Sequence, residues 1–118
     1  MNPVTLVSNN DDHRSYRAGE KIFNAGEQGN YMYIVIDGEV LIERDGQIVR
    51  TIAPGDIFGE MSLIDASPRS ADAVAKTDCI IAPVDERHFL FLVHETPMFA
   101  LHVMGVMANR LRSHLDSK

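Results

Sequence analysis

Hydrophobic and polar residues alternate over short distances between residues 15 and 84, as they do in β-strands. The segment 31–36 is rich in β-branched and aromatic residues, which is typical of a strand with two half-buried faces. Further strands are predicted at 39–43 and 48–52. Asp45-Gly46 lies between them and is a strong hairpin signal, because a type I′ turn needs a positive φ at both central residues. Short strands bounded by turn residues predict an antiparallel barrel or jelly roll.

The pattern changes to that of helices at Asp85, which can cap a helix over 86–94. Thr96-Pro97 is typical of an N-cap followed by the first helical position, so a second helix is predicted from Pro97 to about Leu115. Its apolar residues form two stripes: Leu101, Met104, Ala108, Leu111 and Leu115 in one, and Phe99, Val103 and Val106 in the other. One stripe is enough to dock a helix on a barrel, so the second predicts either a broad buried face or another partner.

Composition narrows the classes of function. The chain has 118 residues, a length that predicts one domain. It has 11 Lys plus Arg against 17 Asp plus Glu, a net charge of −6, so we expect an acidic domain that does not bind nucleic acid. No apolar run is long enough to span a bilayer, so no membrane role is expected. The single cysteine, Cys79, favours a reducing, cytoplasmic location. The five histidines lack the spacing of a zinc site, and we expect no metal or cofactor.

One segment, residues 55–74, combines groups suited to a small phosphorylated ligand. Gly59 precedes an amphipathic stretch, 60–64, that can form a turn or two of helix, and a helix N-terminus attracts an anion. Arg69 is followed by two small residues, so its planar guanidinium has room to reach a phosphate, assisted by the hydroxyl of Ser70. Glu60 would repel a phosphate but is a good acceptor for sugar hydroxyls.

These residues alone leave a second interpretation open. Glu60 and Arg69 could form a salt bridge across a loop and have no ligand at all. No residue is placed as a nucleophile beside a base, so enzymatic activity is not expected on either interpretation.

The same segment resembles a known family. Gly59-Glu60 followed by Pro68-Arg69-Ser70-Ala71 is similar to the phosphate-binding cassette of cyclic nucleotide-binding domains, as in catabolite activator proteins and protein kinase A regulatory subunits. The resemblance runs in order from about residue 15 to 112. It includes Arg17-Ala18-Gly19-Glu20, Phe23, Gly26-Glu27, the strand 31–36 with Asp37-Gly38-Glu39-Val40, and Pro54-Gly55-Asp56.

The resemblance implies a mainly β fold with flanking α-helices. It predicts an eight-stranded antiparallel β-roll (a double-stranded β-helix or jelly roll) over about 15–84, followed by helices over about 85–95 and 97–115. Residues 1–14 are expected to be a lead-in or part of a short capping helix, and 15–118 to form the domain. A cyclic nucleotide would lie between the roll and the final helix.

It also implies roles for individual residues. Arg69 would pair with the cyclic phosphate, assisted by Ser70 and followed in the cassette by Ala71. Glu60 would accept from the ribose 2′-hydroxyl, and the backbone of Gly59 would approach the sugar and phosphate. Four apolar residues are expected either to wall the pocket or to be plain core: Ile42, Val49, Ile52 and Phe58.

The preferred base stays open, with cAMP favoured over cGMP. In the family, alanine after the arginine goes with cAMP and threonine with cGMP, and Ser70 could serve either. The position at which the family's regulators contact adenine falls near His114, which is expected either to contact the base or to be a solvated residue near the C-terminus.

The expected function is that of a small regulatory sensor that signals to an unknown protein effector through movement of its last helix. A homodimer through Leu101, Met104, Leu111 and Leu115 is one hypothesis. The chain ends soon after this helix, so the resemblance implies a domain without the helix-turn-helix of the family's regulators, either free-standing or part of a longer protein.

Two alternatives belong to other classes of protein. A cupin-type enzyme would need histidines on its strands, and the segment 15–84 contains none. A roll that has lost its ligand and serves only for assembly would be expected to lack Glu60 or Arg69, and this chain has both.

Overall fold

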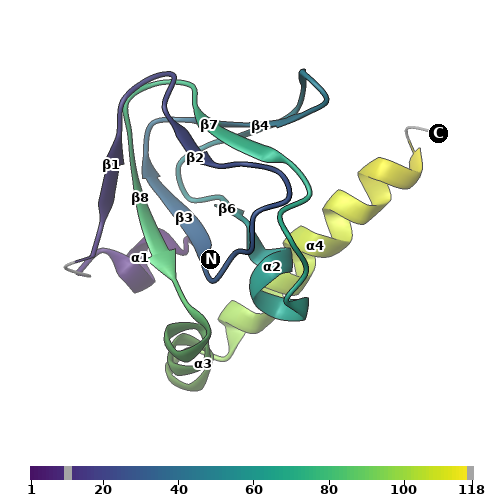
Figure 1. Ribbon diagram of the computed structural model, residues 1–118. Coiled ribbons are helices and arrows are strands. Elements are labelled where there is room, and N and C mark those ends of the chain that lie inside the picture. Colours follow the sequence, from purple (N-terminus) through teal and green to yellow (C-terminus); the bar gives the residue numbers. More distant parts are fainter. Residues whose placement is uncertain (10–11, 117–118) are drawn as a thin grey trace.

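The computed structural model describes residues 1–9 and 12–116, and in these residues the chain folds as two four-stranded antiparallel sheets with flanking helices (Figure 1). One sheet has the strand order β1-β8-β3-β6 and the other β2-β7-β4-β5. The strands are β1 (Arg14–Tyr16), β2 (Lys21–Phe23), β3 (Met32–Asp37), β4 (Val40–Arg44), β5 (Gln47–Ile52), β6 (Ile57–Phe58), β7 (Asp72–Ala75) and β8 (Cys79–Val84). The predicted eight-stranded roll is confirmed.

The helices are α1 (Val4–Val7), α2 (Glu60–Asp65), α3 (Glu86–Glu95) and α4 (Met98–Asp116). The predicted cap of α3 is confirmed, because the Asp85 carboxylate accepts a hydrogen bond from the backbone N–H of His88 at 2.8 Å. Helix α4 begins at Met98, one residue after the predicted start, and runs past α2 (Figure 1).

The hairpin between β4 and β5 forms as the dipeptide signal predicts. Asp45 has φ 54° and Gly46 has φ 78°, so both central residues are left-handed, as a type I′ turn requires. Ile42 pairs with Arg50 in this hairpin, and a bulge follows between Ile42 and Glu43. The hairpin therefore presents Ile42 and Arg50 on the same face of the sheet.

Strand β3 is buried on both faces, and its alternating side chains contribute to two hydrophobic cores. Tyr33 and Val35 belong to the core between the sheets, together with Val40, Ile52 and Phe58. The intervening residues, Met32 and Ile34, pack against the helices, in a second core with Val7, Leu92, Phe99 and Val103.

The two apolar stripes of α4 differ in burial. Phe99 and Val103 are buried against the roll, whereas Leu101, Met104 and Leu111 are 59%, 55% and 60% exposed. One stripe therefore docks the helix, and the other is open in the described part of the chain. No single described helix is long and apolar enough to cross a membrane; α3 with 98–113 of α4 meets that requirement only as a pair bent by 118°.

Candidate functional site

The guanidinium of Arg69 is buried and forms no ion pair with a carboxylate in the described part of the chain. The residue is 6% exposed, and its two terminal nitrogens donate to the carbonyl oxygens of Gly59 at 2.9 Å and Tyr31 at 2.7 Å. Its Cζ lies 4.1 Å from the centre of the Phe23 ring. Burial lowers the pKa of Arg69, but an arginine stays protonated. A guanidinium carries five N–H donors, so three are not used by these two carbonyls.

The backbone of Arg69 is fixed by the loop between β2 and β3. The N–H of Gly26 donates to the carbonyl of Arg69, and the N–H of Arg69 donates to the carbonyl of Glu27, both at 2.8 Å. This pair of hydrogen bonds continues the contact between β2 and β7 beyond the ends of the strands. The position of Arg69 therefore depends on a loop some 40 residues earlier in the chain.

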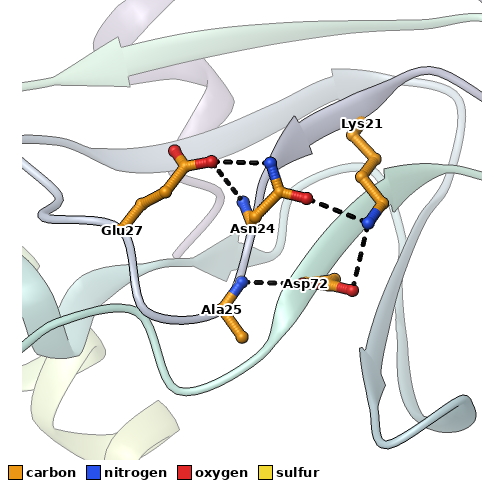
Figure 2. Close-up of polar contacts among 5 residues, drawn as sticks. All are labelled: Lys21, Asn24, Ala25, Glu27 and Asp72. Carbon is orange, nitrogen blue, oxygen red and sulfur yellow. Dashed lines mark hydrogen bonds and ion pairs between the residues drawn. The ribbon is translucent and has the colours of Figure 1, made fainter.

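A polar network holds that loop in place (Figure 2). The carboxylate of Asp72 accepts from the backbone N–H of Ala25 at 2.7 Å and pairs with the Lys21 ammonium at 3.3 Å. Asn24 accepts from Lys21 at 2.9 Å and donates both its backbone and side-chain N–H to Glu27. The N–H of Ala25 holds the pKa of Asp72 below its ordinary value, with a further contribution from Lys21.

Two glycines leave the space that the guanidinium occupies. A methyl group on Gly29 would lie 2.3 Å from Cζ of Arg69, and one on Gly59 would lie 2.7 Å from its Nη1. Gly59 also has φ 74°, a left-handed conformation that glycine adopts without strain. Any larger residue at either position would displace the arginine.

Glu60, the first residue of α2, is 5% exposed and forms an ion pair with Arg110 of α4. Arg110 also donates to the carbonyl oxygen of Ile57. The alternative of a salt bridge between Glu60 and Arg69 is therefore wrong. The ion pair links the short helix that follows Gly59 directly to the last helix of the domain.

A cavity of about 240 Å³ opens beside Arg69. Its wall includes Gly59, Glu60, Arg69, Ser70 and Ala71, so the structure brings all five predicted ligand-binding residues to one cavity. Among the predicted wall residues, Ile42, Val49 and Phe58 also line it. Ile52 does not line this cavity: it is 1% exposed and packs in the core between the sheets, because it faces inward at the end of β5.

A larger cavity, about 790 Å³, continues from the first toward α4. The two share Arg44, Val49, Arg50, Glu60, Met61, Ser70 and Arg110, and the outer one is also lined by Met107, Ala108, Leu111 and Ser113 of the helix. The side chains of His114 and Leu115 lie outside the residues whose side chains the structure describes, so the predicted base contact of His114 stays a prediction.

The lining residues that sequence reasoning missed include Phe23, Arg44, Arg50 and Arg110. The two-residue period of the strands offered a signal for two of them, since Arg44 lies two positions after Ile42, and Arg50 is paired with Ile42. No local signal marks Arg110, because its contact with Glu60 spans 50 residues.

Comparison with known proteins identifies the family to which the chain belongs. The model of the family described as "Cyclic nucleotide-binding domain" matches residues 13–96. The chain is 37% identical over 114 residues to the cyclic AMP receptor protein of Thermus thermophilus, covering 92% of this chain and 53% of that protein. It is 40% identical over 85 residues to the cAMP-dependent protein kinase regulatory subunit of Eremothecium gossypii, covering 72% of this chain and 19% of that protein.

A solved structure, the catabolite activator protein of Thermus thermophilus, superposes with a TM-score of 0.81 at 34% identity and covers 93% of this chain and 54% of that one. The chain thus spans about half or less of the length of these relatives. They are named as regulatory proteins, a receptor, a kinase regulatory subunit and an activator. With a family model that matches most of the chain, this protein belongs to the cyclic nucleotide-binding domain family.

Proposed function

We propose that the domain binds a 3′,5′-cyclic nucleotide in the cavity beside Arg69, with the phosphate on this guanidinium and on Ser70. The observation that carries the proposal is a buried arginine that lines an open cavity and forms no ion pair with any carboxylate among the described residues. A cyclic phosphate carries one negative charge, and the fork geometry of arginine suits its two free oxygens. No metal or cofactor is needed for this binding.

The ribose would lie on Glu60. Its carboxylate is fixed at the start of α2, and it accepts hydrogen bonds but donates none, so it can select a sugar that carries a 2′-hydroxyl. The backbone of Gly59 and the small side chain of Ala71 leave room for the sugar and phosphate. We favour cAMP over cGMP, which is supported by the relatives named for cAMP.

Ligand binding would be signalled to other proteins by a change in the position of α4. Arg110 and the ribose hydroxyl both use the carboxylate of Glu60, so occupation of the cavity changes the balance of contacts that hold α4 against α2. A ligand shifts a conformational equilibrium by its differential contacts with the two states, and this ion pair is one such contact. The domain would then act as a sensor for an effector protein, without chemistry of its own.

We propose that one partner of α4 is a second copy of the chain. The open stripe of α4 carries Leu101, Met104 and Leu111, each more than half exposed, and apolar side chains gathered on one helix face favour burial against another protein. Leu115 continues the stripe in sequence, but its side chain is outside the described residues.

The experiment is a calorimetric titration of the protein with cAMP and with cGMP. A Kd in the micromolar range corresponds to about −8 kcal/mol. A thermal melt at a hundredfold excess of ligand over Kd should show about 2.7 kcal/mol of stabilisation. Absence of binding and of any thermal shift with both ligands would overturn the proposal and favour the assembly module instead.

The proposed signalling through α4 is tested separately by amide hydrogen exchange. Addition of cAMP should change the exchange of α4 as well as that of α2. Binding with no change in α4 would contradict the signalling role and leave the binding role intact.

A further inference from the structure

One face of the Arg69 guanidinium is covered by an aromatic ring. Its Cζ lies 4.1 Å from the centre of the Phe23 ring and 5.7 Å from that of Tyr33. A guanidinium within about 6 Å of a ring centre is attracted by the negative face of the π system, and more strongly when both groups are withdrawn from water. Phe23 is 8% exposed and Arg69 is 6% exposed, so this contact is desolvated. The contacts proposed above for phosphate and ribose give Phe23 no role.

The Phe23 ring is held in place by the core of the roll. Phe23 is the last residue of β2, where it pairs with Ala73 of β7. The centre of its ring lies 6.0 Å from that of Phe58 and 6.2 Å from that of Tyr33, and the latter two rings stack at 5.1 Å. All three rings belong to the core between the sheets. The position of the ring is therefore fixed by core packing and does not depend on the loop that carries Arg69.

The ring and the two carbonyls constrain the guanidinium in different ways. Nη1 donates to the carbonyl oxygen of Gly59 and Nη2 to that of Tyr31, and these bonds fix the group within its own plane. A ring against the face of the guanidinium fixes the tilt of that plane. Each terminal nitrogen then keeps one further N–H, and a phosphate oxygen must approach these donors along the plane that they define. The tilt of the plane therefore decides where a phosphate can bind.

An aromatic ring suits this task better than a carboxylate. A carboxylate beside Arg69 would neutralise its charge and would compete with a phosphate for the same N–H groups. The face of a phenyl ring attracts the cation but has no net charge and leaves the in-plane N–H groups free. Among the described residues, no carboxylate forms an ion pair with Arg69. The ring therefore stabilises the buried cation and leaves its charge available to an anionic ligand.

We propose that Phe23 is a positioning residue for phosphate recognition: its ring holds the guanidinium of Arg69 at the tilt that meets the cyclic phosphate. The inference rests on the proposed function, since it concerns the arginine of the same site. Phe23 acts through Arg69 and not by contact with the nucleotide. When the attraction is weakened, the guanidinium takes other orientations in the free protein. The apparent Kd then rises as the fraction of molecules in the competent orientation falls.

The test replaces Phe23 in the full chain by phenylalanines that carry one, two or three ring fluorines, introduced at a reassigned codon. Fluorine withdraws electron density from the face of the ring and so weakens its attraction for a cation, while the shape of the ring changes little. The control is the same series at Phe99, a ring that is 0% exposed and packs beside Phe89 in the second core. Among the described cation–π contacts, none involves Phe99. Thermal melts show whether each variant is folded.

Calorimetric titration with cAMP should give a Kd that rises with each fluorine at position 23, to at least about threefold above the parent for the trifluoro ring. The series at Phe99 should bind with the Kd of the parent. Phe23→Leu, which keeps an apolar side chain but removes the ring, should raise Kd at least as much as the trifluoro ring does. In the same variant, the NMR resonance of the Arg69 Nε–H should lose the upfield shift that the ring current of Phe23 causes.

Three outcomes would overturn the inference. If the parent binds cAMP but Kd does not depend on the number of fluorines at position 23, Phe23 does not position Arg69, and the proposed function stays intact. An equal rise in the Phe23 and Phe99 series would show a general effect of fluorine on the cores, again with the proposed function intact. Failure of the parent protein to bind either cAMP or cGMP would overturn the proposed function and this inference together.

Discussion

Gly29 lies directly against the guanidinium of Arg69, so that a side chain on the glycine and the arginine's present position exclude one another. A Cβ at position 29 would come within 2.3 Å of both Cζ and Nε of Arg69. The three nearest atoms all belong to the far end of the Arg69 side chain. Substitution of this glycine is therefore expected to displace the arginine.

Gly29→Ala should weaken cyclic nucleotide binding without removing any charged group. We expect Kd to rise about tenfold, which corresponds to about 1.4 kcal/mol, because the guanidinium leaves the position from which it meets the phosphate. Calorimetric titration with cAMP measures this. The matched control is Gly105→Ala in α4, where a methyl group meets nothing within 4 Å. That control should raise stability by about 0.5–1 kcal/mol and leave Kd unchanged.

Arg69→Ala should weaken binding of either cyclic nucleotide by at least tenfold, and more nearly a hundredfold. Removal of a desolvated charge partner costs about 2–5 kcal/mol. Arg69→Lys should also bind less tightly than the parent, since lysine keeps the charge but lacks the two-pronged geometry. Titrations of the three proteins, with thermal melts to show that each is folded, provide the measurement. Equal affinity of Arg69→Ala and the parent would remove this residue from the site.

Much of the fold could be predicted because its signals are local. The apolar run at 31–36 indicated β3, and Asp45-Gly46 indicated the hairpin from the needs of one turn type. Asp85 located the start of α3 to the residue. Ile52 shows the limit of such signals: strand alternation predicts that it faces inward, but not whether it meets a cavity or another side chain.

Part of the candidate site could likewise be predicted from the sequence, and part could not. Arg69 and Glu60 lie nine residues apart in one segment, so their chemistry could be read together from the sequence. Arg110 could not be predicted, because its contact with Glu60 joins residues 50 positions apart and depends on where α4 packs in the folded domain. Gly29 was missed for a related reason, since only the folded β2–β3 loop brings it against Arg69.

Glu60→Gln should separate recognition of the sugar from recognition of the phosphate. We expect the affinity for cAMP to fall about tenfold, because a hydrogen bond to a charged group contributes about 1.5–3 kcal/mol. The affinity for 2′-deoxy-cAMP, which lacks the hydroxyl that Glu60 would accept from, should change far less. Titration of both ligands against both proteins gives the comparison. Equal losses for the two ligands would mean that Glu60 acts only by holding Arg110.

The Asp72 network should make stability depend on pH in acid. The pKa of Asp72 in the folded state is lowered from the ordinary value of 3.8, mainly by the N–H of Ala25. A lowered folded pKa stabilises the protein above the unfolded value, and this contribution is lost as the pH falls through the folded value. Asp72→Asn should therefore lower Tm at pH 7, and its difference from the parent should shrink below pH 3.8.

Thermal melts between pH 7 and pH 2 measure this difference. Asp12→Asn, at an exposed position before β1, is the matched control and should melt with the parent throughout. A difference between Asp72→Asn and the parent that stays constant over the whole range would show that the carboxylate's charge contributes nothing, and that only its shape matters.

The open stripe of α4 should hold two copies of the chain together. Leu101 and Met104 are 59% and 55% exposed, so Leu101→Glu with Met104→Glu costs the isolated domain little but would place charges inside a dimer interface. We expect light scattering to give twice 13.1 kDa for the parent and 13.1 kDa for this variant. Leu90→Glu on α3, at a residue 61% exposed, is the control and should stay dimeric. A parent that is monomeric at high concentration, with and without cAMP, would contradict the homodimer.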